Sequence, residues 1–406
     1  MKASPVEFWI WLQTALGAGA RTDELLAYFE TPEQLYLAGS KEWRLSGLLT
    51  EKKIEALKHS TPSQTLEILK ECRSKGYEII TPDNKLYPER LTHLSGMPLV
   101  LYGIGDCTAL SDVVSIGIVG TRNASEYGTQ IAQKLSYRLA ESGATIVSGG
   151  ALGIDSEAHA GAMLAKGRTV AFLGCGLSSN YLAENAPIRR AITRYGAVVS
   201  EYPPIAAPSK SSFPIRNRLI SGVSLGVVVI EAGVKSGSLI TASRAAEQGK
   251  DVFAVPGDIV RSSFDGTNYL IKNGAKPVFS ALDVLSEYEF LYSDFIDFQK
   301  AAKPLSEVPY VDYKSKKKKA QGSVQQTAPQ PQPTEKPVMA PTKTDISNDA
   351  SCEAQSVYDV LSNEPMHIDD IVRVTNLRMN VVLSSLTELE LLGVCELVSG
   401  KKYKIK

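Results

Sequence analysis

Short apolar runs alternate with helical segments between residues 113 and 255, and this alternation restricts the possible folds more than any other feature of the chain. The runs are apolar at successive positions, which is typical of strands buried on both faces. They are residues 113–119, 144–148, 170–173, 197–200, 225–230 and 252–255. Helical segments follow the first two runs, at 126–142 and 155–166. This order predicts a Rossmann-like α/β domain, in which helices cover both faces of a parallel sheet.

The sequence changes character on both sides of this region. Residues 1–78 carry apolar residues at helical spacing between glycine-rich turns, which predicts a helical bundle of the SAM-like or helix-hairpin-helix type. Residues 301–350 are rich in Pro, Gln, Lys and Thr, as in a flexible linker. In residues 351–406, three helical segments and a hairpin around Ser399–Gly400 predict a winged helix. The Rossmann-like domain is therefore expected to span residues 79–300.

The overall charge and the cysteines narrow the class of protein. Lys and Arg number 44, as do Asp and Glu, so a nucleic acid could be held only by a local basic patch. The five cysteines form no CxxC pair and the four histidines are isolated, which favours a reduced cytoplasmic protein without a metal or cofactor. No run is long and apolar enough to span a bilayer, so we expect no membrane association.

The first motif is Gly120-Thr121-Arg122, which directly follows the strand predicted at 113–119. Open α/β sheets bind ligands at the carboxyl ends of their strands. Backbone N–H groups, an arginine and the N-terminal end of the next helix would all meet a phosphate there. The alternative is a tight turn between strand and helix that carries a surface arginine.

The second motif begins at Ser148 and contains Gly149, Gly150 and Gly153 before Asp155. Glycines let a backbone approach a ligand closely, so Gly149 and Gly150 are candidate binding residues. Asp155 is a candidate as well, although it equally fits the N-cap of the following helix. His159 is interpreted as a structural histidine, because no serine and carboxylate accompany it at a catalytic spacing.

The third motif, residues 213–222, places arginines on both sides of an asparagine just before an apolar segment. Arginines neutralise phosphates, an asparagine can reach a phosphate or a base edge, and an aromatic ring can stack on a base. The alternative for the aromatic residue is that it anchors a loop. The candidate binding residues are Phe213, Arg216, Asn217, Arg218 and Ser221.

The fourth motif follows the apolar run at 225–230. Lys235 offers a cation, and the Ser-Gly-Ser turn at 236–238 opens another helix, so that N–H groups and hydroxyls face an anion. The candidates are Lys235, Gly237, Ser238 and Thr241. Several anion-binding loops at one edge of a sheet suit several phosphates, which favours a polymer over a single nucleotide.

Taken in order, these motifs resemble the DNA-processing protein DprA family, also called Smf. The resemblance is carried by Gly120-Thr121-Arg122, Ser148-Gly149 with Gly153-Ile154-Asp155, Phe213-Pro214 with Arg216-Asn217-Arg218 and Ile220-Ser221-Gly222, and Ser236-Gly237-Ser238-Leu239 with Thr241-Ala242. The chain departs from the family at Leu152, where many relatives have arginine, and at Tyr181-Leu182, where relatives often have Tyr-Pro.

The resemblance implies a protein of competence and recombination. Such proteins bind incoming single-stranded DNA without sequence specificity, protect it, and load the RecA recombinase onto it in natural transformation. They form homodimers through the Rossmann-like domain and have no established catalytic activity. Carried over by position, Arg122 is the leading phosphate contact, and Arg216, Arg218 and Lys235 lie beside it.

Two alternatives stay open. A nucleotide-hydrolysing or nucleotide-binding Rossmann-like enzyme would carry a Pro-Gly-Gly-x-Gly-Thr-x-x-Glu stretch, where this chain has Glu231-Ala232-Gly233. The winged helix could instead hold the main DNA contact. Its candidate recognition helix offers Arg378 but also Glu388 and Glu390, and its other cations, Lys401, Lys402 and Lys404, lie in the wing. This mixture favours contact with protein, and the lysine run 316–319 fits a solvated linker.

Overall fold

The computed structural model describes residues 5–181, 183–312 and, with gaps at 376, 393 and 399–401, residues 351–405. They belong to two compact units, within residues 1–319 and 320–406. Most of the predicted linker, including the lysine run 316–319, lies outside the described residues, as does Leu182. Within the described ranges, no helix combines the length and apolar character needed to cross a membrane.

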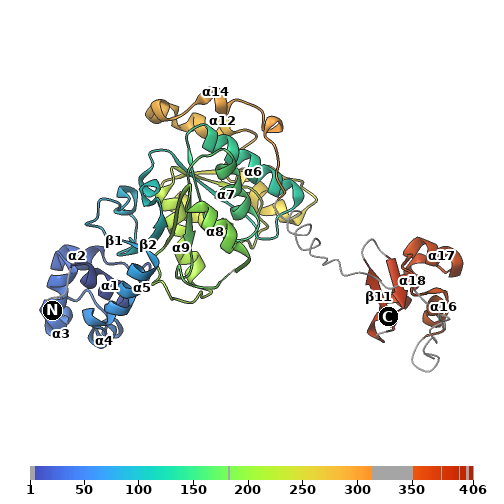
Figure 1. Ribbon diagram of the computed structural model, residues 1–406, viewed down its shortest axis with the longest axis horizontal. Helices are drawn as coiled ribbons and strands as arrows, with labels where there is room; N and C mark the ends of the chain where they lie inside the picture. Colours follow the sequence, from blue (N-terminus) through green and yellow to red (C-terminus); the bar gives the residue numbers. More distant parts are fainter. Residues whose placement is uncertain are drawn as a thin grey trace, which may run out of the picture. The chain divides into compact units, whose positions relative to one another are not determined.

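The first unit begins with a bundle of helices that packs against the sheet (Figure 1). The helices are α1 (Pro5–Leu16), α2 (Asp23–Phe29), α3 (Pro32–Leu45), α4 (Glu51–His59) and α5 (Leu66–Lys75). Trp11 and Leu12 of α1 share one buried cluster with Val100 and Tyr102 at the sheet edge. The side chain of Gln13 also donates to the carbonyl of Val100 at 3.0 Å and accepts from its N–H at 2.6 Å. The helical bundle and the sheet therefore share one core.

Nine strands form the sheet of the first unit, as far as the chain is described. They are β1 (Glu78–Ile80), β2 (Leu101–Gly105), β3 (Ser115–Val119), β4 (Thr145–Ser148), β5 (Thr169–Leu173), β6 (Gly196–Ser200), β7 (Gly226–Val229), β8 (Asp251–Ala254) and β9 (Lys276–Pro277). Their order is β1-β2-β6-β5-β4-β3-β7-β8-β9, with β1 and β2 antiparallel to their neighbours and the rest parallel. The predicted parallel, Rossmann-like sheet is confirmed.

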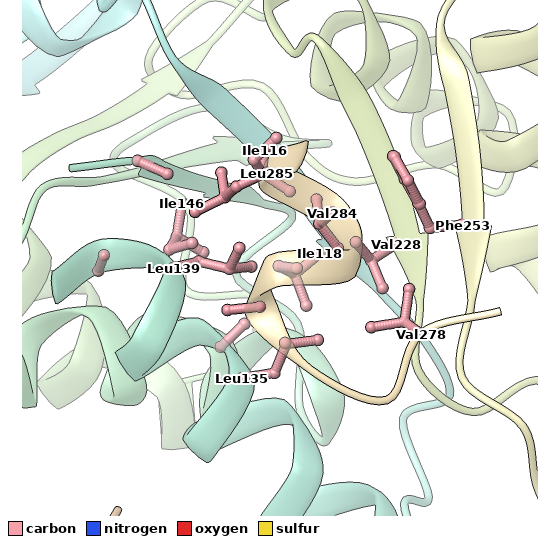
Figure 2. Packing of buried hydrophobic residues seen from close by; sticks show 14 of the residues in the cluster. Ile116, Ile118, Leu135, Leu139, Ile146, Val228, Phe253, Val278, Val284 and Leu285 are labelled. Carbon is pink, nitrogen blue, oxygen red and sulfur yellow. The ribbon is translucent and has the colours of Figure 1, made fainter. Parts of the chain in front are cut away.

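Helices cover both faces of this sheet. They are α6 (Glu126–Glu141), α7 (Ile154–Leu164), α8 (Ala186–Ile192), α9 (Ser212–Val223), α10 (Gly237–Glu247), α11 (Asp265–Lys272) and α12 (Ala281–Leu285). Two short helices, α13 (Glu289–Tyr292) and α14 (Phe298–Ala301), follow, and α14 packs against α6 and α12. Figure 2 shows one face, where Ile116 and Ile118 of β3 pack with Leu135 of α6 and Leu285 of α12. On the other face, α9 and α10 pack against alternate strand residues such as Val119. Successive strand residues thus enter different cores.

Two segments differ from the expectations. Residues 213–222, to which the sequence assigned no regular structure, lie in α9, and Pro214 is tolerated because it occupies the first turn. Residues 301–312, assigned to the linker, pack against α6 instead. Arg138 of α6 donates to the carbonyl of Pro304 at 3.3 Å, and Gln133 bonds in both directions to the backbone of Val311. The described residues up to 312 therefore belong to the folded part of the first unit.

In the described residues of the second unit, three helices and a small antiparallel sheet confirm the predicted winged helix. Its elements are α16 (Cys352–Val360), β10 (Met366–His367), α17 (Ile368–Thr375), α18 (Met379–Leu391), β11 (Cys395–Val398) and β12 (Lys402–Ile405). Val357, Ile371 and Leu386 bring one side of each helix into a shared core. The predicted turn residues Asn376, Gly393 and Ser399–Lys401 lie outside the described residues.

Candidate nucleic-acid interface

A cleft of about 680 Å³ opens at the carboxyl ends of β3 and β7. From β3 the chain continues to β4 on one side, whereas β7 on the other side continues to β8, so the strand order reverses between them. Open α/β sheets bind ligands at such a switch point. The N–H of Thr121 donates to the carbonyl of Glu231 at 2.8 Å, which joins the two strand ends at the base of the cleft.

Most of the candidate residues line this cleft. They are Gly120, Thr121, Arg122, Asp155, Phe213, Arg216, Asn217, Gly237, Ser238 and Thr241. Gly149, Gly150, Arg218, Ser221 and Lys235 are not among its lining residues. The structure therefore brings together segments that are up to 121 positions apart in the sequence, from Gly120 to Thr241, but it separates candidate residues within three of the motifs.

Arg122 stands exposed on the loop after β3. Its guanidinium carbon lies 5.1 Å from the centre of the Phe213 ring, and its Nη1 donates to the hydroxyl of Tyr181 at 3.5 Å. The rings of Tyr181 and Phe213 are themselves 5.3 Å apart. Among the described residues, no carboxylate forms an ion pair with Arg122. Its charge is therefore held in place by neutral groups and stays available to an anion.

Arg216 occupies the floor of the cleft and is buried. Its Nη1 donates to the carbonyl of Gly149 at 2.6 Å and to the carbonyl of Phe172, and its Nε donates to Oδ1 of Asn217 at 3.1 Å. Burial lowers the pKa of Arg216, and the neighbouring Asp155 opposes this shift. Burial likewise raises the pKa of Asp155 against the opposite effect of Arg216. The two buried side chains thus form the charged floor of the cleft. The guanidinium of Arg216 makes its hydrogen bonds to protein groups.

Gly149 and Gly150 of the second motif lie close to the residues of this floor. A Cβ on Gly149 would collide with the guanidinium of Arg216 and would lie 2.6 Å from Oδ2 of Asp155. Gly150 adopts a left-handed conformation with a φ of 64°, which glycine tolerates without strain. Gly149 and Gly150 are predicted from the sequence to let the backbone approach a ligand. In the structure they pack closely against protein groups and are not among the residues that line the cleft. The N-cap assigned to Asp155 is wrong, because Gly153 caps α7 and Asp155 lies in its first turn.

The N-terminus of α10 forms the opposite wall. Ser236 caps this helix of 11 residues, and its Oγ accepts from the N–H of Ser238 at 3.4 Å. The side chain of Asn217 donates to the carbonyl of Gly237 at 3.3 Å and so fixes the helix start against α9. A helix N-terminus carries partial positive charge and favours anions. Lys235 is exposed just before this cap, outside the lining of the cleft.

Arg218 and Ser221 point away from the cleft. Two residues along a helix rotate the side chain by about 200°, so Arg218 faces the side opposite to Arg216. There its Nη2 lies 2.7 Å from both carboxylate oxygens of Glu201, and both side chains are buried. Ser221 is buried within α9 and donates to the carbonyl of Arg218 at 3.3 Å. The sequence pattern predicts both at the binding edge, because it does not reveal that this segment is a helix.

The cleft also contains residues that the sequence analysis did not select. Lys210 and Ser209 lie exposed on the loop before α9, and Asn123 and Tyr181 line the wall near Arg122. Lys210 had one signal in the sequence, since it is a cation three positions before Phe213. Leu152, the departure from the family pattern, lines a separate apolar hollow between α7 and α8.

The described residues give little basis for metal or histidine chemistry here. No group of three His, Cys, Asp or Glu side chains among them is arranged to hold a metal ion. His159 is buried on α7 with its Nδ1 2.7 Å from Oγ1 of Thr169, the first residue of β5, and burial lowers its pKa to about 3. The cleft itself offers cations, N–H groups, hydroxyls and an aromatic face, which are the groups that bind phosphates and bases.

Comparison with known proteins identifies the family. Residues 78–289 match the model for DNA recombination-mediator protein A, and residues 326–401 match the DprA winged helix domain. The chain is 43% identical over 220 residues to DNA processing protein DprA of Bacillus subtilis, covering 54% of this chain and 74% of that protein. It is 34% identical over 346 residues to protein Smf of Synechocystis, covering 83% and 82%.

A solved structure agrees with the sequence comparisons. The X-ray structure of DNA processing protein A (DprA) from Streptococcus pneumoniae superimposes with a TM-score of 0.62 at 33% identity, covering 71% of this chain and 99% of that chain. The fold of this chain thus also occurs in a protein with that name. This chain belongs to the DNA processing protein A (DprA, Smf) family.

Proposed function

We propose that this chain binds single-stranded DNA without sequence preference and holds its phosphates along the cleft. The observation that carries the proposal is the convergence of an unpaired arginine, Arg122, a second exposed cation, Lys210, and the N-terminus of α10 on one cleft. Three anion-binding groups on separate segments suit successive phosphates of a polymer better than one nucleotide. Arg216 adds positive charge from the floor.

The aromatic residues favour a single strand over a duplex. Phe213 and Tyr181 are half-buried in the cleft wall, with their rings 5.3 Å apart. Unpaired bases stack on such side chains whatever their sequence, whereas the bases of a duplex are already stacked on one another. Stacking and phosphate contacts together give affinity without base readout.

The test is fluorescence anisotropy with three labelled probes of equal length: oligo-dT, a mixed-sequence strand, and the same strand paired with its complement. We expect the two single strands to bind within about threefold of each other and the duplex to bind at least about tenfold more weakly. Equal or tighter binding of the duplex would contradict the proposal.

We further propose that the chain protects the bound strand and passes it to RecA during recombination in natural transformation, in the cytoplasm. The match to a recombination-mediator family supports this role. It is tested by following RecA filament assembly on DNA coated with single-strand-binding protein. The chain should accelerate assembly, and Arg122→Ala should accelerate it less; the absence of any acceleration would contradict the role.

A homodimer through the Rossmann-like domain is part of the same proposal. Around α12 and α13, Phe279, Phe290, Leu291 and Phe295 expose 71%, 95%, 71% and 54% of their surface. Exposed apolar patches of this kind mark interaction sites. Sedimentation analysis should show a dimer, and Phe290→Glu should shift it toward monomer; a wild-type monomer at all concentrations would exclude it.

We propose no catalytic activity for the cleft. Among its described lining residues, the acidic one is Asp155, which is buried against Arg216, and none is a histidine. A hydrolase would need a carboxylate that can reach its substrate. Incubation with nucleoside monophosphates should release no free base, and its release would favour the enzyme alternative.

The winged helix is proposed to contact protein. Residues 379–391 of α18 contain no lysine or arginine, and Glu388 is bonded through its carboxylate to the hydroxyl of Ser351 at 2.7 Å. In the wing, Lys404 pairs with Glu396 at 2.9 Å. A recognition helix for DNA is usually basic, so this face suits another macromolecule better.

A further inference from the structure

A second cleft, of about 610 Å³, lies on the other side of the first turn of α9. It forms where the turn after α1 meets α9 and α10, in the region where the N-terminal helices approach α9 in Figure 1. Its charged lining residues are Arg21, Arg90, Arg218, Arg244, Lys250 and Glu247. Five cations thus face one carboxylate, and they come from four separate parts of the sequence.

Three of these cations lack an ion pair among the described residues. Arg244 pairs with Glu247 at 2.7 Å, and Arg218 pairs with Glu201 beneath the cleft. Arg90 instead donates to the backbone carbonyls of Asp112 and Val223, at 3.1 and 3.0 Å, so its charge is not neutralised there. Burial, followed by the nearby charge of Arg90, lowers the pKa of Lys250. Asp251 opposes this shift only in part, so the cations of this cleft outnumber the carboxylates that pair with them.

Arg218 gives a second, independent observation, because part of its guanidinium has no hydrogen-bond partner. Its side chain is 9% exposed, and its Nε and Nη1 have no hydrogen-bond partner although both atoms are buried at the wall of this cleft. A buried N–H group without an acceptor is costly, so native structures rarely retain one without a reason. The guanidinium of Arg218 therefore retains two N–H donors to which the described residues supply no acceptor.

The two clefts are adjacent along the same helices. Pro214 lines both, and on α10 the residues Ile240 and Thr241 line the first cleft, whereas Arg244 lines the second. From Gly237 to Arg244 the helix rises by about 10 Å. This distance matches about three stacked nucleotides at 3.4 Å each.

The geometry points to a second phosphate-binding subsite: the strand that occupies the first cleft continues over Pro214 and α10 into the cleft formed by Arg21, Arg90, Arg244 and Lys250. This inference rests on the proposed single-strand binding. It adds the path that the DNA strand follows and the minimum strand length that fills both clefts. A short oligonucleotide then fills one cleft, and a longer one gains the contacts of both. The turn after α1 thereby gives the N-terminal helices a direct part in binding.

The experiment measures the gain in affinity with length. Anisotropy gives the dissociation constants for about six and about twenty thymidines, and their ratio is the gain. In Arg21→Ala/Lys250→Ala the gain should fall about tenfold, and the salt dependence for the longer strand should flatten by about 1.4, at about 0.7 for each phosphate contact. The matched control is Arg194→Ala/Lys272→Ala, which removes two exposed cations outside both clefts and should keep the gain.

The outcomes separate the two proposals. If the wild-type chain binds the longer strand but the gain is undiminished in Arg21→Ala/Lys250→Ala, the second subsite is wrong and the cleft serves another anion, such as an acidic peptide. If the wild-type chain binds neither oligonucleotide, single-strand binding itself is wrong. Arg21→Glu, at an exposed position, is a second variant that should lower the gain without disturbing a buried group.

Discussion

The loop after β3 and helix α9 both carry arginines at the carboxyl edge of the sheet, but the structure uses them differently. Arg122 on the loop is exposed and lies against the ring of Phe213, and no described carboxylate pairs with it. Arg218 on the helix is buried, and both oxygens of Glu201 lie 2.7 Å from its Nη2. Arg216 is intermediate, since it lines the cleft while bonding to the carbonyl of Gly149.

An arginine in a binding motif is therefore not necessarily a ligand contact. The exposed arginine can neutralise a phosphate at little expense to the fold, whereas the buried ones hold together the segments on which the exposed one depends. The same substitution is therefore expected to have opposite effects in the two regions. The loop should control affinity, and the helix should control stability.

The largest effect is expected from Arg218→Ala. The substitution leaves the carboxylate of Glu201 buried without its partner, so the free energy of unfolding should fall by about 3–5 kcal/mol. Urea denaturation measures this change. Arg194→Ala, which removes an exposed arginine, is the control and should change it by less than about 0.5 kcal/mol. A loss below about 1 kcal/mol for Arg218→Ala would remove the contrast between the two regions.

Arg122→Ala should lower the affinity for single strands and leave the stability of the fold unchanged. Its loss should weaken single-strand binding by about 1–3 kcal/mol, because a charge-assisted contact disappears, while the free energy of unfolding stays within about 0.5 kcal/mol of wild type. Anisotropy at moderate salt measures the first quantity and urea denaturation the second. An unchanged dissociation constant would mean that Arg122 is a surface arginine on a tight turn.

The buried residues near Arg216 also predict that the stability of the fold depends on pH. The pKa of His159 is lowered to about 3, first by burial and then by Arg216, from an ordinary value of 6.5. Between pH 6.5 and 3 the unfolded chain therefore binds a proton that the folded chain does not. Stability should fall with decreasing pH by about 1.4 kcal/mol per unit in this window, or about 2 kcal/mol from pH 6.5 to 5.

His159→Asn removes the titrating group and should flatten this part of the profile. Urea denaturation at pH 6.5 and 5.0 measures the difference, and His59→Asn on the surface serves as the control. Equal slopes in the wild-type chain and His159→Asn would show that other groups govern the acid sensitivity of the fold.

The smallest effect is expected from removing the second unit. A chain that ends at residue 312 keeps the segment that packs on α6 through Arg138 and Gln133. Its affinity for single strands should stay within about twofold of the full chain, because the cleft is complete without the winged helix. A tenfold loss would move the main DNA contact to the winged helix and make the comparison within the first unit secondary.

Much of the fold could be predicted because it follows from local patterns. The apolar runs gave the parallel strands, and helical spacing gave α6, α7 and the winged helix. Residues directly after a strand, such as Gly120 and Arg122, could be placed at the sheet edge because parallel strands end together. α9 was missed because Phe213 and Pro214 interrupt the polar start of the segment, and proline inside the first turn does not mark a helix boundary reliably.

The parts that could not be predicted depend on contacts between distant residues. Whether Arg218 faces a phosphate or a carboxylate depends on the position of Glu201, which only the folded sheet brings near it. Gly149 is predicted from the sequence to let the backbone approach a ligand. In the structure, its lack of a Cβ leaves room for the guanidinium of Arg216. The second cleft joins Arg21 with Lys250, which no local pattern connects.

The measurement that tests the central claim most directly is the salt dependence of single-strand binding in Arg122→Ala/Lys210→Ala. The logarithm of the binding constant is plotted against the logarithm of salt concentration for the wild-type chain and the variant. If these exposed cations hold two phosphates, the slope should flatten by about 1.4, because each contact releases about 0.7 counterions from a single strand. An unchanged slope in a folded variant would contradict the account.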